Sequence, residues 1–138
     1  MNFNINFKCL DARRLGAVKS QVNINNNSTI VSVFKEAGKM NVGFVFSSTY
    51  EPNIGIIRIE GDLTVEDAQE TLDRAMEEWE ASERTRLPKD MAESVHNTIL
   101  SNCIVEASIL ARDVKLPSPV PMPQVTLNNK EMDTSYIR

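Results

Sequence analysis

The sequence predicts an α+β fold, in which an antiparallel β-meander of four to five strands precedes two C-terminal helices and a Pro-rich extended segment. Two patterns along the chain support this prediction. Up to about residue 61, apolar residues alternate with polar ones, and β-branched and aromatic residues are frequent, which is typical of strands with one buried face. After Gly61 the apolar residues recur every three or four positions, which is the period of a helix.

The first part of the chain contains five apolar runs, at residues 3–7, 22–24, 30–34, 42–46 and 54–59. The connections Glu36–Lys39 and Glu51–Asn53 are short, and a short connection can join only antiparallel neighbours. We expect a turn at Asn25–Ser28, because asparagine tolerates the left-handed backbone that turns require. The later runs are therefore expected to form a meander.

A first helix is expected between residues 65 and 86, with Thr64 as its N-cap. One side of this helix is apolar, and its residues are Val65, Ala68, Leu72, Ala75, Met76 and Trp79. The other side is acidic, since the segment holds eight acids and three arginines. We interpret the acidic side as a solvated face.

A second helix is expected from Pro88 to about Val114, because proline fits the first position of a helix. One apolar row recurs at intervals of four, and its residues are Met91, Val95, Ile99, Cys103 and Ala107. Further apolar residues lie on other sides, among them Val105 and Ile109. A helix that is apolar on so many sides is typically buried on several of them, so we predict a homo-oligomer.

The segment from Leu116 to Val125 reads LPSPVPMPQV and holds four of the six prolines. Alternating prolines favour an extended, polyproline-like path. We interpret the segment as a strap over the domain's own core, because Val120, Met122 and Val125 are apolar; a ligand for a proline-recognising module is the alternative. Residues 1–127 are thus expected to form one domain, and residues 128–138 a flexible tail.

Composition narrows the classes of function. The net charge of −4 provides no basic excess for nucleic-acid binding. The N-terminal sequence does not resemble a signal peptide, and no run approaches the roughly 18 apolar residues of a membrane span. We therefore expect a soluble cytoplasmic protein with no membrane insertion. Cys9 and Cys103 belong to no CxxC motif and are expected to be free thiols.

The sequence contains few residues or motifs that indicate catalysis or metal binding. His96 is the single histidine and has no cysteine beside it, which gives a metal site poor support. The five glycines form no phosphate-binding motif. We therefore expect no enzyme, no cofactor and no metal. A concave pocket that holds His96 and a carboxylate would instead favour an enzyme.

The order of strands, long apolar helix and proline segment resembles the SecB-like family of export chaperones. The local similarity lies in Leu116–Pro117, followed by mostly apolar residues and Pro123–Val125, and in Ile59–Gly61 at the expected end of the last strand. The acidic helix is longer, and the tail shorter, than the family pattern. The chain therefore resembles a divergent member, for which docking to an export ATPase is not implied.

The resemblance implies chaperone-like binding of non-native polypeptides in an apolar groove, without catalysis or cofactor. Its candidate client-binding residues are Val120, Met122, Val125, Phe44 and Phe46. The alternative is a small oligomeric structural or adaptor protein, whose protein partner docks on the acidic helix or on the sheet edge. A continuous exposed apolar groove would favour the chaperone, and a fully covered sheet would favour the adaptor.

Overall fold

A computed structural model describes residues 1–18 and 21–120 of the chain. Four strands come first and two helices follow, which confirms the predicted α+β class and the order of its elements. The elements are β1 Asn2–Arg14, β2 Asn23–Glu36, β3 Lys39–Glu51, β4 Gly55–Glu66, α1 Gln69–Ala81 and α2 Lys89–Asp113. The part of the proline segment from residue 121 onward lies outside the described residues.

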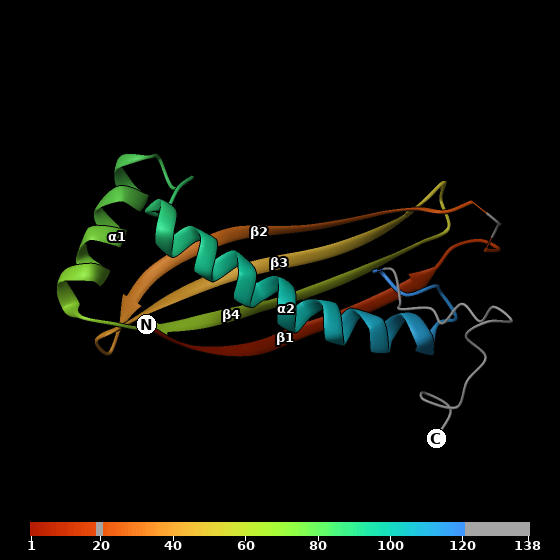
Figure 1. Cartoon of the computed structure of the whole chain (residues 1–138), viewed down its shortest axis with the longest axis horizontal. Coiled ribbons are helices and arrows are strands. Elements are labelled where there is room, and N and C mark those ends of the chain that lie inside the picture. Colours follow the sequence, from red (N-terminus) through yellow and green to blue (C-terminus); the bar gives the residue numbers. More distant parts are fainter. Residues whose placement is uncertain (19–20, 121–138) are drawn as a thin grey trace, which may run out of the picture.

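The four strands form one antiparallel sheet in the order β1-β4-β3-β2. Strands β2, β3 and β4 make the expected meander through short turns. Strand β1 does not join β2; it pairs with β4, from Asn2 opposite Glu66 to Arg14 opposite Gly55. Strands β1 and β2 are therefore the two edges of the sheet, as Figure 1 shows.

The turn expected at Asn25–Ser28 is wrong, because this segment lies within β2 and pairs with β3. The runs at 22–24 and 30–34 therefore belong to one long strand, which leaves four strands in the sheet. Asn25 and Asn27 stand opposite Thr49 and Ser47, and both asparagines are exposed. Pairing with β3 thus outweighs the low strand propensity of asparagine.

The predicted start of the first helix is also wrong. Strand β4 continues through Gly61 to Glu66, so Thr64 is a strand residue and α1 begins at Gln69. The continuation is stabilised by the burial of Leu63 and Val65. A Cβ at Gly61 would clash with the carbonyl oxygen of Asn6 on β1, so this position needs a glycine for close approach of the two strands.

Helix α2 lies diagonally across one face of the sheet, here called the inner face (Figure 1). The predicted row at intervals of four is buried against the sheet and continues to Ala111. The strand residues beneath it are also buried, and they include Met40, Val42, Phe44, Phe46, Tyr50, Ile57, Ile59, Leu63 and Val65. No described helix covers the opposite, outer face, where asparagine, serine and threonine are frequent.

Helix α1 stands at one end of the sheet and packs against β2 (Figure 1). Its buried side consists of Leu72, Ala75 and Trp79. The ammonium of Lys35 on β2 lies 2.6 Å from Asp73 and donates to Gln69 at 2.9 Å, which fixes the first turns of the helix. The acidic residues lie mostly on the exposed side, as the sequence predicted.

The chain after α2 turns back onto the inner face. Lys115 has a φ of 61°, and the following Leu116 is buried. The hydroxyl of Tyr50 donates to the carbonyl of Pro117 at 2.6 Å, and the amide of Asn26 donates to the carbonyl of Pro119 at 2.9 Å. The segment 116–120 is therefore a strap across the core, which is the interpretation that the sequence favoured.

Neither of the helices in the described ranges has the length and apolar character that crossing a bilayer requires.

Candidate binding site between helix α2 and strand β2

A hollow of about 750 Å³ lies where the α1–α2 connection meets the first turns of α2. Carbon atoms form most of its wall, but only two of its lining residues, Leu87 and Ala92, are apolar. The other six are Glu78, Arg86, Lys89, Glu93, His96 and Asn97. An adjoining hollow of about 300 Å³ shares Arg86, Leu87, Ala92 and His96, and it reaches Ser28–Ile30 on β2. Together the two hollows connect the start of α2 with the edge strand of the sheet. We call them the α2–β2 pocket.

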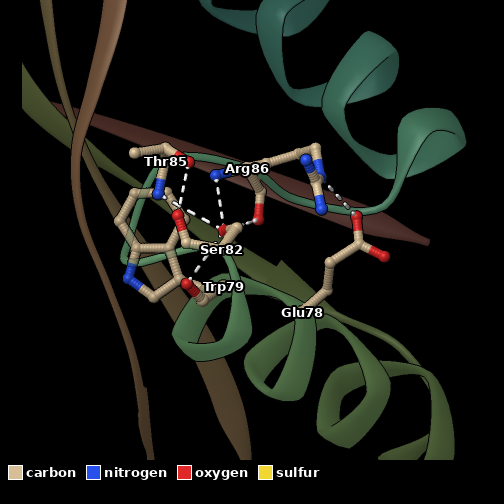
Figure 2. A network of polar contacts seen from close by, with 5 residues as sticks. All are labelled: Glu78, Trp79, Ser82, Thr85 and Arg86. Atoms are coloured by element: carbon tan, nitrogen blue, oxygen red, sulfur yellow. Dashed lines mark hydrogen bonds and ion pairs between the residues drawn. The ribbon is translucent and has the colours of Figure 1, made fainter.

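The wall formed by the α1–α2 connection is held by Ser82, at the end of α1 (Figure 2). Its hydroxyl donates to the carbonyl of Trp79 at 3.0 Å and accepts from the amide of Arg86 at 3.0 Å. The hydroxyl of Thr85 donates to the carbonyl of Ser82 at 2.6 Å. These contacts position Arg86, whose guanidinium lies 3.5 Å from the carboxylate of Glu78. Leu87 is thereby turned into the core.

His96 joins the two sides of the pocket. Its Nδ1 shares a hydrogen bond of 2.8 Å with the hydroxyl of Ser28 on β2. This bond connects the helix to the inner side of the edge strand, because Ser28 stands opposite the buried Phe46. His96 is therefore half-buried at the centre of the pocket.

The pocket combines His96 with the carboxylates of Glu78 and Glu93, which is the combination that would favour an enzyme. In the described part of the chain, however, no carboxylate bonds to the other ring nitrogen of His96. A serine–histidine pair without that third group lacks the element that orients the ring in a catalytic triad. A search of the same residues finds no cluster that could hold a metal ion.

Beyond the pocket, the same side of α2 carries further partly exposed apolar residues. Ala92, His96, Leu100 and Ile104 follow at intervals of four, so they share one side of the helix. Ala92, Leu100 and Ile104 are partly buried, and so are Ile24 and Ile30 on the inner side of β2. Partly exposed apolar side chains thus extend along α2 beyond the pocket.

The side of α2 that points away from the sheet carries exposed apolar residues. Val105 is 63% exposed and Ile109 is 41% exposed. Nearby polar groups are satisfied within the helix: Thr98 and Ser108 each donate to the carbonyl four residues earlier at 2.8 Å. Such hydroxyls can be covered by another surface without losing a hydrogen bond.

Three of the five candidate client-binding residues are described, and they lie in two different places. Val120 is described and half-buried, at the end of the strap. Phe44 and Phe46 are 1% and 0% exposed, so they are core residues beneath α2 and offer no surface to a client. Their burial follows from their position on the inner side of the central strand β3. Met122 and Val125 lie outside the described residues.

The α2–β2 pocket was not predicted from the sequence. Its residues come from the end of α1, from the start of α2 and from β2, and these segments meet only in the folded chain. One signal was present: Leu87–Pro88 places two apolar residues in a short connection, and both are buried. An apolar pair in a connection indicates a segment that packs onto the core.

The two cysteines differ in their surroundings. Cys9 is an exposed free thiol on the edge strand β1. Cys103 is a buried free thiol on α2, and its burial, reinforced by the nearby carboxylate of Glu106, raises its pKa to about 12. The two thiols are unpaired, as the sequence predicted.

No family model, curated protein or solved structure matches this chain in the comparisons with known proteins.

Proposed function

We propose that this protein is a divergent SecB-like chaperone, which binds non-native polypeptides through apolar surface and without catalysis. The observation that supports this proposal most is the apolar path along α2. The α2–β2 pocket measures about 750 Å³ in its larger part, and Leu100 and Ile104 are partly exposed on the same side of α2 as Ala92 and His96. Binding an unfolded chain in such a groove lowers its free concentration and thereby delays aggregation.

The strap supplies a second support for the proposal. Hydrogen bonds from Tyr50 and Asn26 fix the backbone of residues 117–119 over the inner face. Val120 follows this fixed part directly and remains half-exposed. A side chain on an anchored backbone loses little entropy when it contacts a client. Val120 is therefore the described residue that we assign to client binding, with Met122 and Val125 as further candidates.

We further propose that the protein acts in the cytoplasm as a homo-oligomer, in which α2 contributes to the subunit interface. Val105 and Ile109 are exposed one turn apart, and the polar groups around them are satisfied within the helix. Exposed apolar side chains of this kind are favourable in an interface, because each buried Val or Ile side chain contributes about 1.5–3 kcal/mol.

A small adaptor protein is the second candidate function. The acidic side of α1 favours it, since this side exposes four acidic residues: Glu70, Asp73, Glu77 and Glu80. A partner with a basic surface would be attracted to such a helix. An adaptor of this kind would not bind unrelated unfolded chains.

The test is suppression of aggregation of a chemically unfolded model protein, at stoichiometric ratio and without nucleotide. We expect protection by the parent protein. Val120→Ser should weaken binding of a labelled unfolded chain by about fivefold, which corresponds to the loss of roughly 1 kcal/mol of apolar contact. Val31→Ser is the matched control, because Val31 is an exposed valine on β2 and does not belong to the strap.

Circular dichroism and thermal melting should show that both variants fold. If the parent gives no protection at several-fold excess, the chaperone proposal fails and the adaptor takes its place. If the two variants bind the unfolded chain equally well, Val120 has no part in client binding.

A further inference from the structure

Strand β2 has an open edge. It pairs with β3 on one side, and no other strand from the described ranges 1–18 and 21–120 lies along its second side. Helix α1 packs near the later part of the strand, where Val31–Phe34 line a hollow together with Met76 and Trp79. Within the described residues, no strand pairs with the stretch from Asn23 to Ile30 on this side, and the α1–α2 connection at Thr85–Leu87 lines a hollow with the last three residues of this stretch. An uncovered edge strand presents N–H and C=O groups that can pair with another extended chain.

The sequence of β2 does not protect this edge. From Asn23 to Phe34 there is neither a charged residue nor a proline. Charged residues and prolines are the usual means by which proteins prevent a further strand from joining a sheet. The opposite edge differs, because the second half of β1 carries Lys8, Asp11 and Arg13, and a bulge interrupts its pairing between Phe7 and Cys9.

The α2–β2 pocket opens onto this unprotected stretch. Three successive residues of β2, Ser28–Ile30, line its smaller part, and Leu87 and Ala92 line both parts. A strand added beside β2 would direct alternate side chains towards the inner layer of the sheet. Near Ser28 such a side chain would meet a wall of mixed character, in which Ile30, Leu87 and Ala92 are the apolar residues.

We propose that the edge of β2 from Asn23 to Ile30 binds an extended, non-native polypeptide segment as an additional strand, with an apolar side chain in the α2–β2 pocket. This inference rests on the proposed chaperone function and assigns the mode of client binding. Backbone pairing selects for extended conformation and tolerates many sequences. The pocket offers contact to an apolar side chain through Leu87 and Ala92, which line both of its parts. Its rim adds no charge preference, because Glu78 and Glu93 are balanced by Arg86 and Lys89.

The first test uses a fluorescent peptide of about ten residues, in which valine or phenylalanine alternates with threonine. Two N-methylated forms carry methyl groups on alternate amides, so that each form removes the donors on one side of the strand only. We expect one form to bind at least about tenfold more weakly and the other to bind as the parent peptide does. Equal binding of the two forms would overturn the proposal.

The second test changes the pocket. Ala92→Phe should fill it and weaken binding of the unmodified peptide by about tenfold. Ala81→Phe is the matched control, because Ala81 is exposed at the end of α1 and lines neither part of the pocket. The thermal melting temperature of both variants shows whether the fold is kept. If both bind as the parent does, the pocket takes no client side chain and the proposal is wrong.

The aggregation assay separates this inference from the function on which it rests. A parent that does not suppress aggregation contradicts the chaperone function itself. A parent that protects, while the two methylated peptides bind alike, contradicts strand addition alone. Amide hydrogen exchange of the free protein tests whether another segment already covers the edge of β2. Slow exchange of every amide from Asn23 to Ile30 would show that the edge is covered and would contradict the proposal. The covering segment would be a second copy of the protein if light scattering shows an oligomer, and a part of the same chain if it shows a monomer.

Discussion

The hydroxyl of Tyr50 donates to the carbonyl of Pro117 at 2.6 Å, and this bond attaches the segment after α2 to the central strand β3. Tyr50 is fully buried, so its hydroxyl needs a partner within the protein. A second bond joins the strap to the edge strand β2, where the side-chain amide of Asn26 donates to the carbonyl of Pro119. The buried hydroxyl of Ser48 donates to Asn26 and orients that side chain. The strap is thus held by side chains of two neighbouring strands.

Tyr50→Phe should destabilise the protein by about 1–3 kcal/mol, because it leaves the half-buried carbonyl of Pro117 without its donor. Urea denaturation measures the change in the free energy of unfolding. The variant should also show faster proteolysis after α2. An unchanged free energy of unfolding would mean that the strap contributes nothing to the stability of the domain.

The same residue predicts an alkaline loss of stability. Burial raises the pKa of Tyr50 to about 12, from about 10 in an unfolded chain. As the pH rises, Tyr50 therefore loses its proton first in the unfolded state. The stability that the buried, neutral hydroxyl contributes is complete below about pH 10 and is lost as the pH rises towards about 12. The parent should lose more stability than Tyr50→Phe between about pH 9 and about pH 11. Parallel curves for the two proteins would contradict the buried position.

Gly61→Ala should cost about 2 kcal/mol or more, because its Cβ would run into the backbone carbonyl of Asn6 and approach the ring of Phe44. Gly43→Ala is the matched control within the same sheet. The new Cβ at Gly43 would meet only the side chains of Ser32 and Val31, and the Ser32 hydroxyl can rotate away. Thermal melting of the two variants checks the order of the costs. If Gly43→Ala lowers the melting temperature more than Gly61→Ala does, the close approach of β1 and β4 at Gly61 is contradicted.

Thiol labelling should distinguish the two cysteines. Near neutral pH one equivalent of a maleimide should react rapidly, at the exposed Cys9, and Cys9→Ser should remove this phase. Cys103 should react only after unfolding, because burial raises its pKa to about 12 and excludes the reagent. Rapid reaction of two equivalents in the folded protein would show that α2 separates from the sheet.

Val105→Asp together with Ile109→Asp should dissociate the proposed homo-oligomer, since both side chains are exposed on α2 and a buried carboxylate in an interface is costly. Light scattering at micromolar concentration measures the mass. Ala81→Asp adds the same kind of charge at the exposed end of α1 and should leave the mass unchanged. A parent that is already a monomer at this concentration would remove the basis of the prediction.

The sequence by itself determined the fold class and the side of α2 that is buried. Apolar residues at intervals of four, from Met91 to Ala107, share one side of a helix, so this row could be predicted without knowledge of any neighbouring segment. Short connections determined the meander of β2, β3 and β4 for a similar reason, because they leave the chain no room for another arrangement.

Tertiary structure decided the features that depend on a partner segment. The asparagines of β2 form a strand because β3 pairs with them, and the strand at Gly61 continues because β1 approaches it closely. The α2–β2 pocket also depends on tertiary structure, since Ser28, Leu87 and His96 are far apart in the chain and meet only after α1 and α2 have packed. Local propensity and periodicity describe what one segment prefers, whereas pairing and burial depend on which segment lies beside it.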